Sequence, residues 1–458
     1  MEEHSSGAIE ISMLFFPHAG QGHLLPMVDM AKLFASRGAT VTILALSSTA
    51  PLITSSVDRA GIRLILLAPS ASLRPAFESS MRDLRPDCVV TDMFMPWTYH
   101  SATALGIPRI LFDGTGFFAR CADHALDRLR PLDPAVRSFT HPGLPHRIEL
   151  LFSQTPDYLK KPGRPLTAFD RIFAEKKAVD PLNYGVLVNS FYELEPNYVD
   201  HYRHVIGRKA WHVGPVALCN QNFADMSSRG GSAQGECLTW LDGRPRGSVV
   251  YVCFGSGTVL GRAQTREIAR GLEATGKPFV WAVRGASEDG LPRGFEERIK
   301  GRGLLVRGWV PQLLILGHRA VGGFVTHCGW NSTLEGINAG LPMVTWPMFA
   351  EQFYNEKLVV DVLKVGLAVG SKVYAPDGEE RAGVGAEAVE KAVRDLMGVG
   401  EEAEGRRRRA RELGQKANRA VEKGGSSYED VGNLIWELRQ RKKAQMDVEA
   451  TLNKVRAL

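Results

Sequence analysis

The chain has 458 residues, of which 44% are hydrophobic and 23% charged, and a formal net charge of +6. This composition is typical of a globular protein, and the length predicts two domains of about 200 residues each. The basic runs at 405–416 and 439–443 lack interleaved aromatic residues, so we expect solvated helix faces and no nucleic-acid partner.

The six cysteines are far apart and form no CxxC pair, which argues against a zinc site or a redox motif. The first ten residues are polar and acidic, without the apolar core of a signal peptide. No apolar stretch approaches the ~18 residues that a membrane span requires. We therefore expect a reduced, cytoplasmic protein without a membrane span.

In the first half, apolar runs of strand length alternate with helical patterns. A helix is predicted at 24–38, where Gly38 provides a C-terminal cap. The runs are apolar throughout rather than alternating, which favours strands buried on both faces of a parallel sheet. They cover residues 11–17, 40–46, 63–69, 86–94, 109–114 and 184–191.

The second half repeats this order of strand, glycine-rich turn and helix. A strand at 248–257 enters a turn and is followed by a helix at 263–276. Further strands are predicted at 278–284, 303–310, 322–327 and 342–347.

The fold class is therefore α/β, with two Rossmann-like, doubly wound parallel-sheet domains that face each other across a cleft. The first domain spans 1–219, a Gly/Ser-rich linker spans 220–236, and the second domain spans 237–425. Residues 426–458 are predicted to form a C-terminal helix that packs back on the first domain, followed by a tail. Ligands of such domains bind beyond the carboxyl ends of the strands, which here means along the cleft.

The segment "HCGWNSTLEGINAG", residues 327–340, joins a predicted strand to a predicted helix. A helix N-terminus has unpaired N–H groups and favours anions, and His327, Asn331 and Ser332 add hydrogen-bonding side chains there. The same residues also fit an ordinary capping box, in which Glu335 reaches back to the cap. Capping requires neither His327 nor Trp330, so we favour an anion site that holds a diphosphate.

The wider stretch "WVPQLLILGHRAVGGFVTHCGWNSTLEGINAGLPMVTWPMFAEQ", residues 309–352, resembles the donor-binding signature box of plant family-1 UDP-sugar glycosyltransferases. The similarity also includes "GQGHLLPM" near the start and "WLDGRPRGSVVYVCFGSG" in the middle, and it covers almost the whole chain. The most similar members glucosylate flavonoids, triterpenoids and steroids. The fold implied by this resemblance is GT-B.

The resemblance also implies a role for each residue of the donor site. Trp309 is expected to stack on uracil, and Glu335 to bind the ribose hydroxyls. The remaining donor-site residues are Val310 and Gln312 beside the base, Ser256, His327, Asn331 and Ser332 at the diphosphate, Trp330, Glu351 and Gln352 at the sugar, and Thr115 near its 6-hydroxyl.

In the same family the His of the "GH" pair is the general base, an assignment that falls on His23 and not on His18. "GQGH" lacks the third glycine of a dinucleotide-binding loop. An imidazole titrates near neutrality and suits proton removal from a hydroxyl, and a carboxylate stabilises it as it becomes charged. Asp92, which ends a predicted buried strand, is the expected partner. The predicted reaction is a direct displacement without a metal or other cofactor, since no metal-binding DxD occurs.

The acceptor site is less constrained by the sequence. Phe94, Phe117 and Phe118 are expected to supply an apolar wall near His23 and Asp92. His18 stands where relatives usually have a small or apolar residue, and it is interpreted as a solvent-facing side chain or a second polar contact. Relatives also have a longer loop after the strand at 63–69, so the pocket is more open here or residues are absent from the chain.

The predicted function is inverting transfer of a sugar, glucose according to Gln352, to a hydroxyl of a small lipophilic plant metabolite. The expected partners are a UDP-sugar and a small acceptor, and the protein is expected to be a monomer. Two alternatives remain open at this point: an NAD(P)-dependent oxidoreductase on a doubly wound fold, and a non-catalytic sugar-nucleotide binder.

Overall fold

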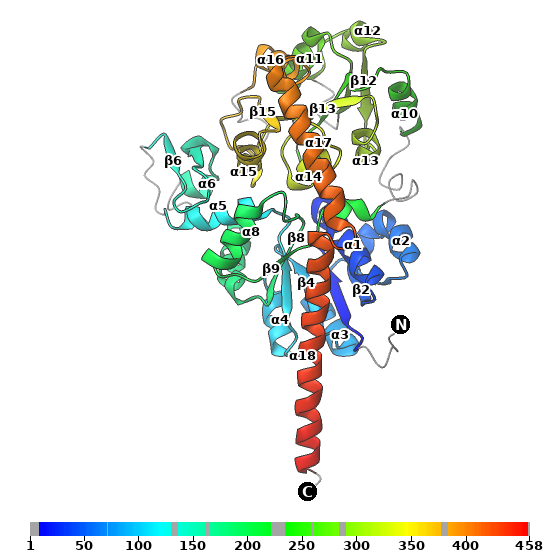
Figure 1. Ribbon diagram of the computed structural model, residues 1–458, viewed down its shortest axis with the longest axis vertical. Coiled ribbons are helices and arrows are strands. Elements are labelled where there is room, and N and C mark those ends of the chain that lie inside the picture. The colour runs from blue at the N-terminus through cyan, green and yellow to red at the C-terminus, as the bar shows by residue number, and fades with distance from the viewer. Residues whose placement is uncertain are drawn as a thin grey trace.

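The structure, a computed structural model, describes residues 9–70, 72–129, 136–160, 165–220, 234–258, 260–283, 290–376 and 383–456. Two parallel sheets form its framework, one from each half of the chain, and the two halves lie one above the other in Figure 1. The Rossmann-like α/β fold class predicted from the sequence is confirmed. Most of the predicted linker lies outside the described residues.

The N-terminal sheet has seven strands in the order β3-β2-β1-β4-β5-β8-β9, and every neighbouring pair is parallel. The apolar runs of the sequence form these strands because both faces of the sheet are covered. The strands are β1 Ser12–Phe16, β2 Thr40–Leu46, β3 Arg63–Leu67, β4 Cys88–Asp92, β5 Arg109–Phe112, β8 Gly185–Val188 and β9 Ala210–His212.

The C-terminal sheet has six parallel strands in the order β12-β11-β10-β13-β14-β15. The predicted strands of this half are all present. Four are shorter than their apolar runs, and β13 has the predicted length but begins one residue earlier. They are β10 Val249–Cys253, β11 Phe279–Val283, β12 Gly303–Arg307, β13 Val321–Thr326, β14 Met343–Thr345 and β15 Gly366–Ala368. A separate antiparallel pair, β6 Ser138–Thr140 and β7 Glu149–Leu151, lies beside the N-terminal half.

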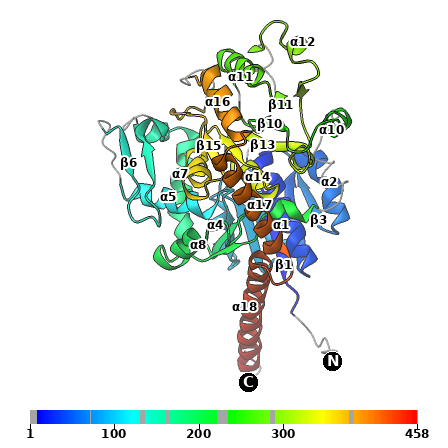
Figure 2. The same ribbon diagram turned by 45° about the horizontal axis from the view of Figure 1, so that its top comes forward.

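Helices cover both sheets, as Figures 1 and 2 show. In the N-terminal half they are α1 Gln21–Ser36, α2 Ala50–Arg59, α3 Arg74–Leu84, α4 Thr98–Ala104, α5 Phe117–Asp127, α6 Asp157–Lys160, α7 Ala168–Val179 and α8 Pro196–Asp200. In the C-terminal half they are α10 Gln234–Asp242, α11 Arg262–Thr275, α12 Phe295–Ile299, α13 Gln312–Leu316, α14 Trp330–Asn338, α15 Gln352–Lys357, α16 Ala386–Leu396, α17 Glu401–Val421 and α18 Ser426–Arg456. The 3-10 helices are η1 Ser47–Thr49, η2 Phe152–Gln154, η3 Asp180–Leu182 and η5 Val216–Cys219, and the π-helices are η4 His201–Val205 and η7 Leu358–Val362. Among the described residues, no helix combines the length and apolar character needed to cross a membrane.

Helix α18 returns from the C-terminal half to the N-terminal sheet, and its far end extends beyond the body of the molecule (Figure 1). Val431, Leu434, Ile435 and Leu438 are at most 4% exposed and belong to the same apolar core as strand β1. Residues 443–456 of the same helix are exposed. The first turns of α18 therefore complete the N-terminal core, as expected from the sequence.

In each sheet the strand order reverses between two central strands. Strand β1 pairs with β2 on one side and β4 on the other, and β10 pairs with β11 and β13 in the same way. In doubly wound sheets a crevice opens at this reversal, beyond the carboxyl ends of the two strands. His23, Ser256 and His327 lie in the segments that follow β1, β10 and β13, and Asp92 is the last residue of β4.

Candidate active site

His23 and Asp92 meet at the reversal point of the N-terminal sheet. Nδ1 of His23 lies 2.7 Å from Oδ2 of Asp92, whose side chain is completely buried. The Phe94 N–H donates to the other Asp92 oxygen at 3.0 Å and fixes the carboxylate. Because a carboxylate only accepts, Nδ1 of His23 has the proton and Nε2 keeps its lone pair. The predicted pair therefore has the geometry of an oriented base.

Opposing influences act on the pKa of His23. Burial, the largest of them, lowers it, but the hydrogen bond and negative charge of Asp92 and the charge of Glu351 raise it more. The net pKa of the His23 imidazole lies above its ordinary 6.5. His23 is therefore a stronger base than a free imidazole.

Helix α1 begins at Gln21, three residues earlier than predicted, so His23 lies in its first turn. Pro26, inside the helix, has no N–H to donate to the carbonyl four residues before it, which belongs to Gly22. That carbonyl instead accepts from Nδ2 of Asn331 at 2.7 Å. The proline thus frees an acceptor through which the C-terminal half holds the turn that contains the base.

The predicted donor-site residues line one cavity of about 370 Å³ between the two halves, and His23 lies at its edge. The residues brought together there are Ser256, Trp309, Val310, Gln312, His327, Trp330, Asn331, Ser332, Glu335, Glu351 and Gln352. They come from segments up to 96 positions apart in the sequence, from Ser256 to Gln352. Base and donor box therefore face the same space.

The capping-box interpretation of Glu335 is wrong. Gly329 is the N-cap of α14, without a side-chain cap, so Glu335 lies in the helix interior rather than at N3. Nε2 of Gln312 donates to Glu335 at 2.6 Å and to Ser332 Oγ at 3.1 Å, and Tyr251 O–H donates to Oε1 of Gln312 at 3.1 Å. Gln312 thus orients the carboxylate of Glu335, and the Ser332 O–H remains available as a donor.

His327 lies between two glycines. A Cβ atom at Gly255 or Gly329 would come within 2.5 Å or 2.4 Å of its ring, so only glycine fits at both positions. Burial lowers the pKa of His327 to about 4, which keeps the ring neutral. Its Nδ1 is buried without a hydrogen-bond partner among the described residues. Such orphaned polar atoms in a cavity wall indicate a ligand.

The indole of Trp330 is buried between the two halves, and the residue also lines the cavity. It is 2% exposed, and its Nε1 donates to the Asn189 carbonyl at 2.7 Å. A Cβ at Gly116 would lie 2.6 Å from the ring. The backbone N–H of Trp330 donates to the Glu351 carboxylate.

Glu351 and Gln352 begin helix α15. Burial raises the pKa of Glu351, while hydrogen bonds from backbone N–H groups and the charge of His23 oppose this. Oε1 of Gln352 accepts from the N–H groups of Met348 and Phe349 at 2.8 Å and 3.1 Å. These bonds fix which way the Gln352 amide faces, so its Nε2 is the group that remains to donate.

The prediction that Phe117 and Phe118 line the acceptor pocket is wrong. Both rings are 0% exposed and pack on Tyr202 and Tyr198. At the start of α5, the backbone N–H groups of Phe117 and Phe118 donate to the Glu195 carboxylate. These hydrogen bonds hold this face of the helix inward. Phe94 is half-buried beside His23, with ring centroids 5.0 Å apart, and its place in the acceptor wall stays a prediction.

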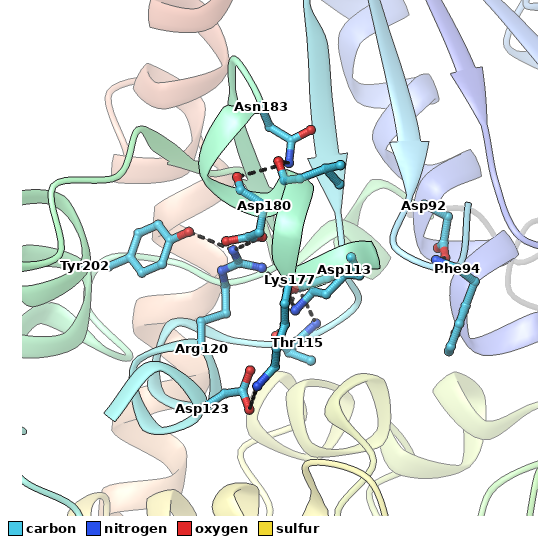
Figure 3. Close-up of polar contacts among 12 residues, drawn as sticks. Asp92, Phe94, Asp113, Thr115, Arg120, Asp123, Lys177, Asp180, Asn183 and Tyr202 are labelled. Atoms are coloured by element: carbon cyan, nitrogen blue, oxygen red, sulfur yellow. Dashed lines mark hydrogen bonds and ion pairs between the residues drawn. The ribbon is translucent and has the colours of Figure 1, made fainter. Parts of the chain in front are cut away.

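Thr115 lies in a buried polar network rather than on the cavity wall. Its hydroxyl donates to Asp113 at 3.0 Å, and Asp113 forms an ion pair with Arg120 (Figure 3). Arg120 also donates to Asp180 at 3.0 Å and to the Tyr202 hydroxyl at 2.7 Å. We infer that this network holds the turn that includes Gly114.

The Gly114 turn packs against the base. Gly114 has a φ of +77°, and a Cβ there would lie 3.1 Å from Cε1 of His23. Any larger residue at this position would therefore press on the imidazole as well as strain the backbone.

The sequence interpretation missed two polar side chains in the cavity wall. Thr258 Oγ1 and both polar atoms of the Asn338 side chain are buried without partners among the described residues, and both residues line the cavity. Asn338 lies three residues beyond Glu335 on α14, so the helical repeat could have indicated it. Thr258 lies two residues beyond Ser256, in the glycine-rich turn.

Fold and site together define a GT-B enzyme with a nucleotide-sugar cavity and an oriented base. The family model of UDP-glucuronosyl and UDP-glucosyl transferases matches residues 208–373. UDP-glycosyltransferase 73B4 of Arabidopsis thaliana is 43% identical to this chain, over 94% of it and 99% of the relative. Scopoletin glucosyltransferase of Nicotiana tabacum is also 43% identical, over 93% and 97% of the two chains. The chain belongs to this family and is a plant-type UDP-glycosyltransferase.

Solved structures agree with this assignment. UGT73P12 of Glycyrrhiza uralensis, in complex with glycyrrhetinic acid 3-O-monoglucuronide, has a TM-score of 0.91 and 37% identity, and the match covers 97% of this chain and 99% of that one. UGT71G1 of Medicago truncatula, in complex with UDP-glucose, has a TM-score of 0.80 and 27% identity, over 94% and 98% of the two chains. Family membership rules out the oxidoreductase and the non-catalytic binder as interpretations of this chain.

Proposed function

We propose that the protein is an inverting O-glucosyltransferase that uses UDP-glucose and a hydroxyl of a small lipophilic plant metabolite, such as a flavonoid, triterpenoid or steroid. The observation that carries the proposal is the His23–Asp92 pair, 2.7 Å apart, at the edge of the cavity formed by the donor box. Relatives named after scopoletin, a flavonoid and abscisate support a small hydroxylated acceptor.

In the proposed reaction Nε2 of His23 takes the proton of the acceptor hydroxyl. The oxygen attacks the anomeric carbon and forms the new C–O bond, while the bond from that carbon to the diphosphate oxygen breaks and UDP leaves from the opposite face. Asp92 accepts the hydrogen bond from Nδ1 and stabilises the imidazolium as it forms. A single displacement of this kind inverts the anomeric configuration.

We assign charge stabilisation of the departing UDP to the N-terminus of α14 and its neighbours. Helix N-terminal N–H groups favour a diphosphate. His327 stays neutral and donates a hydrogen bond, and the Ser332 hydroxyl, whose oxygen already accepts from Gln312, points its proton to the ligand. Asn331 and Ser256 complete the proposed diphosphate site. The proposal assigns no metal to this step, so a chelator should leave the rate unchanged.

The uridine is assigned to the opposite end of the cavity. Trp309 stacks on uracil beside Val310, and Glu335 accepts hydrogen bonds from the ribose hydroxyls. Gln312 fixes the Glu335 carboxylate for this role.

For the sugar, Glu351, Gln352 and the Trp330 backbone read the equatorial hydroxyls. Thr115, which the resemblance placed near the 6-hydroxyl, is not assigned to the sugar, because it does not line the cavity and its hydroxyl donates to Asp113.

The donor assignment is tested by competition among UDP-glucose, UDP-galactose and UDP-xylose on 7-hydroxycoumarin. An axial 4-hydroxyl leaves buried polar groups unpaired at about 1–3 kcal/mol, so glucose should exceed galactose by roughly ten- to a hundredfold in kcat/KM. Xylose retains the equatorial pattern and should be the better-tolerated substitute. Equal use of galactose would refute the glucose assignment.

The mechanism is tested by product configuration and by His23→Ala. The anomeric proton of the product should show the β configuration, opposite to that of the donor. His23→Ala should lose about 10²–10⁴-fold in kcat while UDP affinity stays nearly constant, because the base acts on the acceptor. Near-normal turnover in this variant would contradict the assignment. We also infer that one chain suffices, and sedimentation of active enzyme as a monomer tests this.

A further inference from the structure

A second imidazole lies next to the catalytic one. The ring centroid of His18 is 6.0 Å from that of His23, with the ring planes at 81°. Phe94 touches both rings, at centroid distances of 4.9 Å from His18 and 5.0 Å from His23. Both imidazoles therefore lie in contact with Phe94, at the point where β1 leads into α1.

Local hydrogen bonding fixes which nitrogen of His18 has the proton. The Gly20 N–H donates to Nδ1 of His18 at 3.1 Å, so this nitrogen is an acceptor. Burial lowers the pKa of His18, and the charge of His23 acts in the same direction, against an opposing effect of Asp92. The ring is thus neutral at physiological pH and has its proton on Nε2.

The Nε2–H of His18 has no acceptor in the described part of the chain. His23 presents a lone pair at its own Nε2, as shown above. One ring is therefore a hydrogen-bond donor and its neighbour an acceptor, and both rings contact Phe94. A buried or half-buried donor without a partner favours a ligand oxygen in that place.

The surface next to these rings is aromatic. The Phe169 ring on α7 lies 6.0 Å from Phe94 and 4.5 Å from Phe173, and Phe173 lies 6.3 Å from Phe94. Phe169 is 55% exposed, which is unusual for a large apolar ring in a folded protein. We call Phe94, Phe169 and Phe173 the Phe94 cluster. Such a surface suits a flat aromatic acceptor.

We propose that His18 is a specificity-determining residue that donates its Nε2–H to an oxygen next to the reacting hydroxyl. The preferred acceptors are then aromatic rings with two oxygens on neighbouring carbons, such as catechols or ortho-methoxyphenols. Hydrogen bonds from both rings reach about 2.8 Å, so centroids 6.0 Å apart suit two vicinal oxygens. This inference rests on the proposed O-glucosylation.

Two acceptors that differ only at the neighbouring carbon test the proposal. In 7-hydroxy-6-methoxycoumarin the reacting hydroxyl has a vicinal oxygen, and in 7-hydroxycoumarin it has none. With UDP-glucose, kcat and KM are measured for each, and the preference is the ratio of the two kcat/KM values. Comparing this ratio between enzyme variants removes the intrinsic difference in reactivity of the two phenols.

Two substitutions separate hydrogen bonding from shape. His18→Phe keeps a flat ring without a donor, and His18→Gln keeps an N–H at similar reach. One hydrogen bond is worth about three- to tenfold in affinity, so His18→Phe should lower the preference by that factor, mainly through KM of the methoxy compound. His18→Gln should retain most of it. His100→Phe, an exposed histidine on α4, serves as the matched control and should change nothing.

UDP binding, measured by calorimetry, shows whether each variant is folded, and it should equal that of the wild type. An unchanged preference in a folded His18→Phe variant overturns the inference and leaves the proposed function intact. If His18→Phe does not fold, loss of the preference in His18→Gln overturns it as well. If the wild-type enzyme glucosylates neither coumarin, the proposed function fails for phenols, and the inference fails with it.

Discussion

At the scale of single residues, the protonation state of His23 depends on the charged groups around it. Asp92 and Glu351 both favour the imidazolium, and burial opposes it. His23 must be neutral to accept a proton, although its neighbouring carboxylates favour the protonated form. The rate consequently depends on pH in a direction that follows from the sign of the pKa shift.

The first prediction concerns Asp92→Asn. The raised pKa of His23 predicts that kcat/KM of the wild type falls as pH decreases through a value above 6.5, where the base becomes protonated. Removing the charge of Asp92 removes the main raising influence, so this acidic limb should move to lower pH. The maximal rate should also fall about 10²–10⁴-fold, because the imidazolium loses its stabilising partner. A pH–rate profile of both enzymes measures this, and an unmoved limb would contradict it.

The second prediction concerns Glu335→Gln. Glu335 lies inside α14 rather than at its cap, so the free energy of unfolding should change by less than about 0.5 kcal/mol. Loss of a carboxylate at the ribose should raise KM for UDP-glucose more than tenfold. Glu401→Gln, in the exposed first turn of α17, is the control for a surface carboxylate. Donor affinity equal to that of the control would show that Glu335 does not bind the ribose.

Several of these residues could be predicted from the sequence, and the reasons for the misses are physical. His23 and Asp92 follow predicted strands, so their meeting at one sheet edge follows from the fold. Phe117 and Phe118 also follow a strand, but the phase of α5 turns both rings inward. The link from Asn331 to Gly22 was missed, although Pro26 marks that carbonyl as free.

At the scale of elements, α18 and β9 depend on each other. Asp430 on α18 accepts from the His212 backbone N–H at 3.1 Å, lies 3.2 Å from His212 Nε2 and forms an ion pair with Arg203. Glu437, two turns later, accepts from the Tyr184 hydroxyl at 2.7 Å and forms an ion pair with Lys209. The edge strand of the sheet is thus held by carboxylates of a distant helix.

The third prediction is that Asp430→Ala destabilises the protein by about 2–4 kcal/mol. The substitution leaves the buried His212 N–H without its acceptor and the half-buried Arg203 guanidinium without its ion-pair partner. Glu437→Ala, at a more exposed pair, should cost less than about 1 kcal/mol. Urea unfolding of both variants measures the difference. Equal losses would mean that burial of Asp430 has no influence on stability.

Long apolar runs predicted the central strands well, because continuous apolar sequence is what a two-sided buried sheet requires. Strands β9 and β15, with three residues each, were missed. Segments this short have too few residues for a pattern and are stabilised by their neighbours, here α18 and η7. The hairpin of β6 and β7 was missed for the same reason.

At the scale of the whole molecule, catalysis requires both sheets. In the proposed mechanism the base comes from the first half and the donor box from the second. The connections between the halves include Asn331 to Gly22, Trp330 to Asn189, and α18 on the N-terminal core. Helix α18 follows the C-terminal half in the sequence, but its tertiary contacts make it part of the N-terminal half.

The fourth prediction compares two truncations within α18. Among the described residues, ending the chain after Lys443 removes only exposed ones, 444–456, and it should leave Tm within about 2 °C of the full chain. Ending it after Gly425 uncovers the core beneath Val431, Leu434, Ile435 and Leu438, at about 1.5–3 kcal/mol per lost side chain. The shorter chain should unfold at much lower temperature or fail to fold. Thermal unfolding of both measures this, and similar Tm values would show that α18 does not complete the N-terminal core.

The packing of α18 on the N-terminal half has a consequence for recombination between related enzymes. In a hybrid made by joining two relatives at the linker, the N-terminal half comes from one parent. The C-terminal half comes from the other parent and includes α18. Asp430 and Glu437 would then face a foreign strand β9, and four apolar side chains would enter a foreign core. Productive recombination therefore needs two crossovers, one in the linker and one near Gly425, so that α18 is inherited with the sheet it covers.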